Sequence, residues 1–347
     1  MSLGIPLKLL SSKIPPVRHA HQDFFTRFGE LANGADEICV LTGYVSTKSL
    51  LFVKANIESG SLPTIVLTIG MHAFGRFSRA QYDLVKEIAE LLKNSNSGTV
   101  AICTAFPFHG KLYIFRRANR PQAALLGSSN LSGLDQSRQV FELDIEVEEE
   151  ELLAELEMLH DDVRSKVTED FLDWEPTKFK PSNLMAELPN TTVVFQEEVI
   201  NVQNRIQTEY RLPLKCKPKS NMNVYHGKGR QSKRTGLVRP RPWYEIEVIV
   251  SSSITSLTGY PRKRAFDVIT DDGWKFRCKT SGDHAKNLRS EDNLEILGTW
   301  IKGRMEEAGK LNIGDVVTKS HLTGYGRSHI SLCSTDDRDL WFLSFKP

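Results

Sequence analysis

The stretch FHGKLYIF at residues 108–115 decides the fold of the first half of the chain, and LGSSNLS follows it at residues 126–132. His109 and Lys111 stand two residues apart in a run that has the composition of a β-strand. Because side chains alternate along a strand, we expect both to leave the same face. The sequence therefore predicts a histidine and a lysine side by side, next to a glycine-bearing turn.

These residue types suit chemistry at phosphorus. A histidine such as His109 can attack phosphorus and divide one displacement into two through a phosphohistidine. Lys111 offers a positive charge to the phosphate oxygens, whose negative charge shifts in the transition state. Gly127 lets the backbone approach closely, while Ser128 and Asn130 give neutral donors. No His/Cys/Asp cluster has metal-ligand spacing, so we expect neither a metal ion nor another cofactor.

The two motifs resemble the signature of the phospholipase D superfamily, His-x-Lys followed by Gly-Ser-x-Asn. They resemble most closely the BfiI-like and NgoFVII-like restriction nucleases of that superfamily, over essentially the whole chain. The aspartate of the superfamily is absent, because Arg116 stands where we look for it. The resemblance implies that an acidic residue on the following strand orients the histidine, with Glu142 as the first candidate and Asp144 as the alternate. The predicted catalytic set is His109, Lys111, Ser128, Asn130 and Glu142.

Strand and helix patterns alternate through the first half. Short buried runs predict strands, an amphipathic pattern predicts a helix at 79–93, and acidic residues 149–163 predict a second helix. The runs that predict strands are 37–41, 64–68, 99–105, 111–115, 122–127 and 141–147. The pattern predicts a phospholipase D-like α/β domain with a mixed sheet over residues 1–175.

Prolines and weak periodicity predict a linker at 176–190, and the second domain then covers 191–347. Its short strands, with polar and glycine-bearing connections, predict a mostly-β pseudobarrel. The expected strands include 244–250 and 316–319, and one helix is expected at 294–307. The stretches around Trp274, around Trp300 and at 311–317 resemble a B3-type DNA-binding domain.

The net charge of +2 conceals an asymmetry between the halves. From Lys215 onward there are 24 Lys and Arg against 15 Asp and Glu, which leaves 21 against 28 for the rest of the chain. A basic half joined to an acidic half suggests that one domain faces a polyanion. The five cysteines are scattered and never in CxxC spacing, and no apolar run approaches ~20 residues, so we expect a cytoplasmic protein without disulfides or membrane spans.

Three basic stretches of the second half are candidates for binding DNA. Arginine and lysine neutralise phosphates, whereas mixed Arg, Asn, Asp and His side chains can read base edges. The B3 resemblance implies two arms that grip the major groove, with 251–264 matching the first and 279–289 the second; 225–234 is an added loop. The candidates are Lys228, Arg230, Lys233, Arg234, Arg262, Lys263, Arg264, Lys279, Ser281, Asp283, His284, Lys286, Asn287 and Arg289.

The chain carries only one copy of the catalytic motif, so a leaving oxygen needs its acid from elsewhere. A second His109 across a twofold axis supplies it, which predicts a homodimer through the nuclease domain. The interpretation is a type II restriction endonuclease acting on double-stranded DNA, with a cognate methyltransferase and, as in relatives, a separate helicase-like ATPase as possible partners. The alternatives are a lipid phosphodiesterase and a DNA-binding regulator with an inactive nuclease domain. His19, His21, His72 and His160 are expected to be surface or structural residues.

Overall fold

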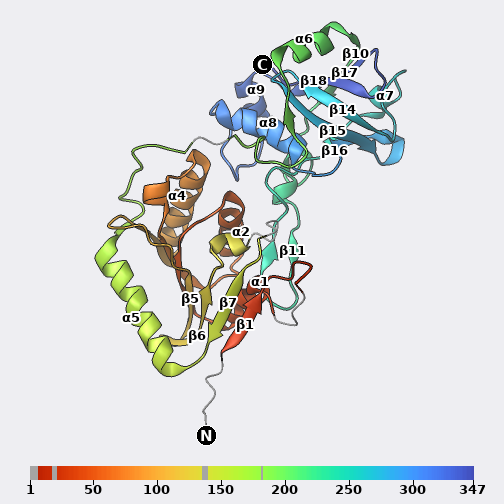
Figure 1. Ribbon diagram of the computed structural model, residues 1–347. Helices are drawn as coiled ribbons and strands as arrows, with labels where there is room; N and C mark the ends of the chain where they lie inside the picture. Colours follow the sequence, from red (N-terminus) through yellow and green to blue (C-terminus); the bar gives the residue numbers. More distant parts are fainter. Residues whose placement is uncertain (1–6, 18–21, 135–139, 181–182) are drawn as a thin grey trace. The chain divides into compact units, whose positions relative to one another are not determined.

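The computed structural model describes residues 7–17, 22–134, 140–180 and 183–347. The chain forms two compact units, coloured along the sequence in Figure 1. Unit 1 consists of residues 1–181 and 230–239, and unit 2 of residues 182–229 and 240–347. The first crossing between the units falls inside the stretch where the sequence predicts a linker. Residues 230–239, which the sequence analysis places in the second domain, belong to unit 1. His19 and His21 lie outside the described residues.

A mixed eight-stranded sheet forms the middle layer of unit 1 (Figure 1). Its order is β1-β7-β6-β5-β2-β3-β4-β8, in which β2, β3 and β4 run parallel and the other neighbours antiparallel. The strands are β1 (Lys8–Ser11), β2 (Glu37–Thr42), β3 (Thr64–Ile69), β4 (Gly98–Cys103), β5 (Leu112–Arg117), β6 (Arg120–Gly127), β7 (Leu143–Val147) and β8 (Thr168–Asp170).

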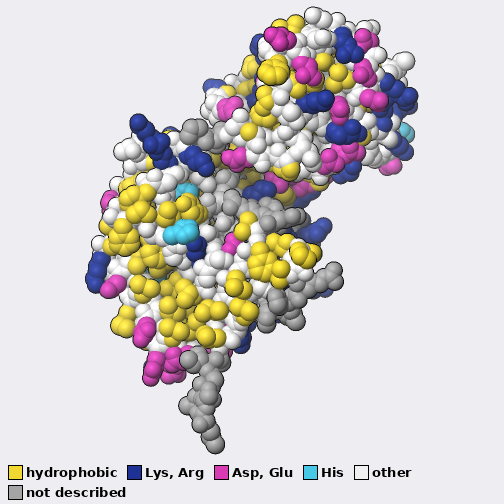
Figure 2. Space-filling model, viewed as in Figure 1, with side chains coloured by type: hydrophobic (Ala, Val, Ile, Leu, Met, Phe, Trp, Pro, Cys, Tyr) yellow, Lys and Arg dark blue, Asp and Glu magenta, His cyan; other side chains and the backbone are white. Residues whose placement is uncertain are grey.

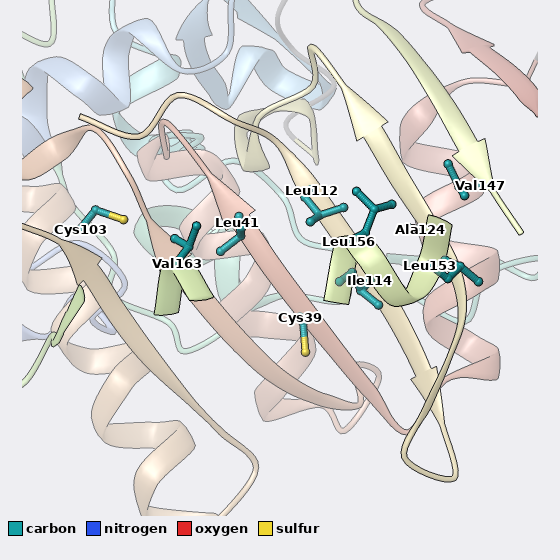
Figure 3. Close-up of a cluster of buried hydrophobic side chains, with 10 residues drawn as sticks. All are labelled: Cys39, Leu41, Cys103, Leu112, Ile114, Ala124, Val147, Leu153, Leu156 and Val163. Atoms are coloured by element: carbon teal, nitrogen blue, oxygen red, sulfur yellow. The ribbon is translucent and has the colours of Figure 1, made fainter. Parts of the chain in front are cut away.

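Helices pack on both faces of this sheet. They are α1 (Phe24–Gly34), α2 (Thr47–Glu58), α3 (His72–Gly75), α4 (Arg79–Asn94) and α5 (Glu150–Val167), with a short 3-10 turn, η1 (Leu131–Leu134). Leu112 and Ile114 of β5 join a buried cluster with side chains of α5 (Figure 3). The alternating residues Tyr113 and Phe115 point to the opposite face and pack against Phe28 of α1. Alternation along one strand thus supplies the core of two layers.

The helix predicted at 79–93 is α4, and its start is fixed by a capping box. The Ser78 side chain accepts from the backbone N–H of Gln81, whose own side chain accepts from the N–H of Ser78. Tyr82, Val85 and Ile88 recur at helical spacing and are buried. The acidic helix predicted at 149–163 is α5, capped by Glu149.

Unit 2 is built around a second sheet, in the order β10-β17-β18-β14-β15-β16-β13, with β9 added beside β15. Its strands are β9 (Thr192–Val193), β10 (Ile206–Pro213), β13 (Val248–Ile249), β14 (Ala265–Thr270), β15 (Trp274–Ser281), β16 (Asn287–Ser290), β17 (His329–Thr335) and β18 (Leu340–Ser344). Its helical segments are α6 (Gln196–Asn204), η2 (Asn221–His226), α7 (Ser252–Thr255), η3 (Asp283–Ala285), α8 (Ile296–Glu307) and α9 (Lys319–Tyr325).

Two predicted strands of the second half differ from the structure. Of the run 244–250, only β13 forms strand. The run 316–319 forms none, because Thr318 caps α9 by accepting from the backbone N–H of His321. Val317 donates instead to the side-chain oxygen of the buried Asn223. In the part of the chain that the structure describes, no helix combines the length and apolarity needed to cross a membrane.

Candidate active site and DNA-binding residues

The predicted catalytic residues meet at one edge of the sheet of unit 1. Strands β5, β6 and β7 are neighbours, with Leu112 opposite Leu126 and Gly127 opposite Asp144. The segment before β5, the loop after β6 and the residue before β7 therefore lie together. Gly127 is required there, because a Cβ atom would stand 2.4 Å from a carboxylate oxygen of Asp144 and 2.5 Å from the carbonyl oxygen of Leu143.

His109 and Lys111 are in direct contact just ahead of β5. The Nζ atom of Lys111 lies 3.2 Å from each of the two ring nitrogens of His109. Lys111 is 8% exposed. Burial lowers the pKa of its ammonium group, and the negative charge of Glu142 partly opposes that shift. The protonated form of this lysine places its positive charge against the imidazole ring of His109.

The side chain of Asn130 is held by two residues at the end of β2 and just after it, Thr42 and Tyr44. Its Oδ1 atom accepts from the backbone N–H of Tyr44 at 2.9 Å and from the hydroxyl of Thr42 at 3.5 Å. These two hydrogen bonds fix the orientation of the amide, whose Nδ2 group is the end that can donate to a substrate oxygen. Gly43 keeps this turn close, since a Cβ atom there would lie 3.0 Å from the ring of His109.

Tyr44 lies between two histidines, and the sequence analysis did not single it out. Its ring packs edge-to-face on His109, with centroids 5.6 Å apart, and on His72, with centroids 5.5 Å apart. His72 is buried, accepts from the backbone N–H of Val45 and stacks on Phe77, and burial lowers its pKa to about 4. It is therefore a neutral structural support. The sequence carries no motif for this turn, because its role depends on β2 lying beside β5.

Ser128 and Glu142 form a second pair at the site. The Ser128 hydroxyl donates to Oε2 of Glu142 at 2.5 Å and accepts from the backbone N–H of Leu143 at 2.9 Å. The backbone N–H of Glu142 donates to the hydroxyl of Ser12 on the neighbouring segment. The structure thus brings Glu142 to Ser128 and into the electrostatic range of Lys111. The hydrogen-bonding neighbour described for His109 is the lysine.

Asp144 has a different position from Glu142. It is 3% exposed, and its carboxylate accepts from both the backbone N–H and the hydroxyl of Ser129, at 2.9 and 2.6 Å. Burial nevertheless raises the pKa of this carboxyl group. Ser129 also gives its carbonyl oxygen to the hydroxyl of Tyr113. Asp144 and Ser129 therefore fix the loop that carries the two neutral donors.

Arg116 has a structural role away from this edge. It forms ion pairs with Glu37, at 2.8 Å, and with Glu157 of α5. A cavity of about 440 Å³ borders the site and is lined by Asn130 and Glu142, with Phe24 and Phe25 from the start of α1. Among the described residues, no group of three or more His, Cys, Asp or Glu side chains is placed to hold a metal ion.

The site is surrounded by apolar side chains that are open to solvent. Figure 2 shows hydrophobic side chains gathered beside the histidines on this face of unit 1. Tyr44, Phe106, Phe141 and Leu143 are 38%, 45%, 42% and 51% exposed. Phe106, Phe141 and Leu143 each lie within three residues of a predicted catalytic residue in the sequence, and Tyr44 packs on the ring of His109. These four side chains form an apolar rim beside the site.

The second-arm candidates lie together in unit 2. Lys279 and Ser281 end β15, η3 carries Asp283 and His284, Lys286 follows, and β16 carries Asn287 and Arg289. Ser281 pairs with Asn287 and Lys279 with Arg289 across the two strands. The Oδ1 atom of Asn287 and the Nε atom of Arg289 are buried, with no hydrogen-bond partner among the described residues.

The other basic candidates are divided between the two units. In unit 2, Arg262 donates to the carbonyl oxygen of Thr255 and Arg264 forms an ion pair with Asp339, while Lys263 is exposed. Lys228 also belongs to unit 2 and is exposed. Arg230, Lys233 and Arg234 belong to unit 1.

Two family models match this chain. The model of the NgoFVII restriction endonuclease N-terminal PLD domain matches residues 22–170, and that of the NgoFVII C-terminal B3-like DNA-binding domain matches residues 201–336. The chain belongs to the NgoFVII restriction endonuclease family. The predicted fold class, a phospholipase D-like domain followed by a B3-like domain, is confirmed. In this NgoFVII-type chain, β5, β6 and β7 of the first domain bring the catalytic candidates together.

Solved structures resemble parts of the chain at low identity. Phosphatidylserine synthase of Haemophilus influenzae Rd KW20 is 12% identical with a TM-score of 0.37, over 53% of this chain and only 42% of that one. Nuc of Salmonella typhimurium, a phospholipase D family member, is 18% identical with a TM-score of 0.30, over 47% and 96%. NucT of Helicobacter pylori is 9% identical with a TM-score of 0.30, over 46% and 98%. No curated relative matches the sequence.

Proposed function

We propose that this nuclease acts on DNA as a type II restriction endonuclease, cutting double-stranded DNA at specific sites through a phosphohistidine at His109. The observation that carries the proposal is the meeting of His109, Lys111, Ser128 and Asn130 at one sheet edge, in a chain that also holds a B3-like DNA-binding domain. That domain disfavours the lipid phosphodiesterase. The proximity of His109, Lys111, Ser128 and Asn130 supports an active nuclease over the inactive regulator.

In the first step, a ring nitrogen of His109 attacks the scissile phosphorus. A P–N bond forms, the bond from phosphorus to the leaving oxygen breaks, and that oxygen takes up a proton. In the second step water attacks the same phosphorus and the P–N bond breaks. This step regenerates the free histidine and leaves a terminal phosphate on the DNA. The chemistry needs no metal ion, because Lys111 and the amide of Asn130 supply positive charge and donors for the phosphate oxygens.

Glu142 supports this chemistry through Lys111 and Ser128. Its charge favours the protonated lysine, which is the form that can stabilise an anionic transition state. Its hydrogen bond from Ser128 fixes the side chain beside the phosphate site. Glu142 is a positioning residue in this proposal, and its role as the partner that orients His109 stays a prediction.

The leaving oxygen obtains its proton from His109 of a second copy of the chain. The exposed rim of Tyr44, Phe106, Phe141 and Leu143 supports such a twofold contact, because it is apolar and surrounds the site. One composite site then serves two subunits. A cognate methyltransferase and a separate helicase-like ATPase are partners that this function would have in the cytoplasm.

The test is cleavage of unmethylated plasmid DNA by the purified protein in excess EDTA. Discrete fragments are expected, and acid-labile labelled protein should appear when a reaction on labelled DNA is quenched. Cleavage that is lost in EDTA and restored by magnesium would contradict the metal-independent mechanism. Fragments without discrete ends would contradict the site-specific function.

A further inference from the structure

Residues 230–239 form a hairpin that belongs to unit 1, although the chain on both sides of it belongs to unit 2. Strands β11 (Arg230–Gln231) and β12 (Val238–Arg239) pair with each other in antiparallel fashion. The chain before and after the hairpin, 182–229 and 240–347, belongs to unit 2. The hairpin is therefore part of the nuclease unit, although its residues lie in the second half of the sequence.

The contacts of the hairpin are specific and buried. Asn56 of α2 is fully buried and bridges the backbone of Val238, donating to its carbonyl oxygen at 2.8 Å and accepting from its N–H at 2.7 Å. Thr235 and Leu237 are 3% and 1% exposed. Thr235 lies against Gly29 of α1 so closely that a Cβ atom on this glycine would stand 2.6 Å from its Cβ atom.

A chain of ion pairs connects the hairpin to strand β7. Arg234 forms an ion pair with Glu30, which also accepts from Arg27 at 3.2 Å. Arg27 in turn donates to Glu146 of β7, which is fully buried. Three residues of β7 thus form hydrogen bonds to this network or to the loop after β6. Glu146 accepts from Arg27, Asp144 accepts from Ser129, and the backbone N–H of Leu143 donates to Ser128.

The two helices beneath the hairpin begin at the active site. Phe24, at the start of α1, packs on Tyr113, whose hydroxyl donates to the carbonyl oxygen of Ser129. The helix α2 begins just after the turn at Tyr44. Phe25 of α1 and Phe52 of α2 pack edge-to-face, so the two helices are in contact with each other. Packed side chains therefore connect the hairpin end of these helices to both sides of the 128–130 loop.

We propose that the 230–239 hairpin is a positioning element of the nuclease site, which holds α1 and α2 in their active arrangement. The proposal rests on the nuclease function proposed above. In this proposal a basic residue of the hairpin has a role within the nuclease unit, because Arg234 anchors the hairpin to α1 through its ion pair with Glu30. Removing the contact should slow cleavage and leave recognition of DNA unchanged.

Gly29→Ala in the full chain tests the proposal. Alanine favours the helix itself, but its methyl group displaces Thr235 by about 1 Å, and a misplacement of that size can cost about a hundredfold in rate. We expect single-turnover cleavage to fall at least about tenfold, with the Kd for cognate DNA unchanged. Gly34→Ala is the matched control, because nothing lies within 4 Å of a Cβ atom at that end of α1.

Thr235→Gly removes the two closest atoms that the new methyl group would meet and leaves the end of the Leu237 side chain at 3.0 Å, so Gly29→Ala combined with Thr235→Gly should recover most of the rate. Two independent destabilising changes would instead add their losses. Asn56→Ala is a second way to release the hairpin, because it removes the hydrogen bonds to the backbone of Val238. Glu58→Ala is its control, because Glu58 is exposed on the same helix. Failure of the double variant to recover would overturn the steric coupling.

Hydrogen exchange gives a measurement that does not depend on activity. Releasing the hairpin should speed exchange at the Val238 N–H, held by Asn56, and at the Tyr44 N–H, held by Asn130. Faster exchange at Val238 with unchanged Tyr44 exchange and normal cleavage would make the hairpin a passive surface and overturn the proposal. If the unmodified protein cuts no DNA, the nuclease function fails, and Tyr44 exchange alone decides whether the hairpin positions the site.

Discussion

The carboxylate of Asp144 receives both the backbone N–H and the hydroxyl of Ser129, at 2.9 and 2.6 Å, in a buried setting. Glu142, two residues earlier, accepts from Ser128 and faces the site instead. The two carboxylates at one strand end therefore have separate tasks. Asp144 holds the 128–130 loop in shape, and the charge of Glu142 acts on Lys111.

This difference predicts separable effects of the two alanine variants. Asp144→Ala leaves the buried donors of Ser129 unpaired, so it should lower the free energy of unfolding by about 1–3 kcal/mol. Glu142→Ala removes a partly exposed group and should leave that free energy nearly unchanged while it slows cleavage. Urea unfolding together with single-turnover rates separates the two. At a temperature where both are folded, Glu142→Ala should be the slower enzyme; the reverse order would move the catalytic role to Asp144.

The pH dependence of cleavage should follow Lys111. Burial lowers its pKa below the ordinary value of 10.5, so the protonated form, and with it the rate, should be lost at a lower pH than for an exposed lysine. Glu142 raises this pKa. Glu142→Gln should therefore move the alkaline limb of the single-turnover profile to still lower pH. An alkaline limb that stays in place in Glu142→Gln would show that the lysine does not set it.

His109→Ala should abolish cutting and keep specific binding, because the nucleophile lies in unit 1 and the reading arms in unit 2. We expect the cleavage rate to fall by at least about a thousandfold, since removal of a nucleophile eliminates the covalent route. Lys111→Ala should behave similarly. Gel-shift titration on a cognate duplex measures binding. Loss of binding together with cleavage would contradict the division of labour between the units.

The grouping of His109, Lys111, Ser128 and Asn130 could be predicted from sequence because they lie next to strands, in two motifs with fixed spacing, whereas their catalytic roles stay predictions. Their arrangement then follows from the pairing of β5, β6 and β7. Tyr44 and Ser129 could not be found in this way, since their roles depend on which strands are neighbours. The contact of Gly29 with Thr235 joins residues far apart in the chain and rests on shape alone. For that reason the sequence predicts Arg230, Lys233 and Arg234, in the added loop 225–234, as DNA-binding residues.

A dimer through the catalytic face is the next prediction. Phe141 is 42% exposed beside Glu142, so Phe141→Glu should convert a sedimenting dimer to a monomer and lower cleavage. Met158→Glu is a suitable control, because this side chain is 63% exposed on α5 and lies outside the rim. Equilibrium sedimentation of the full chain gives the oligomeric state. A wild-type monomer with full activity would refute the shared site.

The last prediction concerns where sequence is read in the DNA. Asp283 lies in the turn η3 between β15 and β16, exposed, among Lys286, Asn287 and Arg289. Near DNA phosphates a carboxylate is repelled, so its presence is favourable only if it accepts a hydrogen bond, for example from a cytosine amino group. Arg289 or Arg262 can then pair with a guanine edge, which predicts a recognition site containing G·C pairs.

Asp283→Ala should therefore cost about 1–3 kcal/mol on the cognate duplex, while binding to scrambled DNA stays equal or becomes stronger. Lys228→Ala is the contrasting variant, because a lysine that contacts only phosphate should weaken binding to all sequences alike and flatten the salt dependence. Each variant is titrated against cognate and scrambled duplexes across a salt series. Equal losses on both duplexes for Asp283→Ala, or no loss on either, would mean that this turn is structural and that bases are read elsewhere in unit 2.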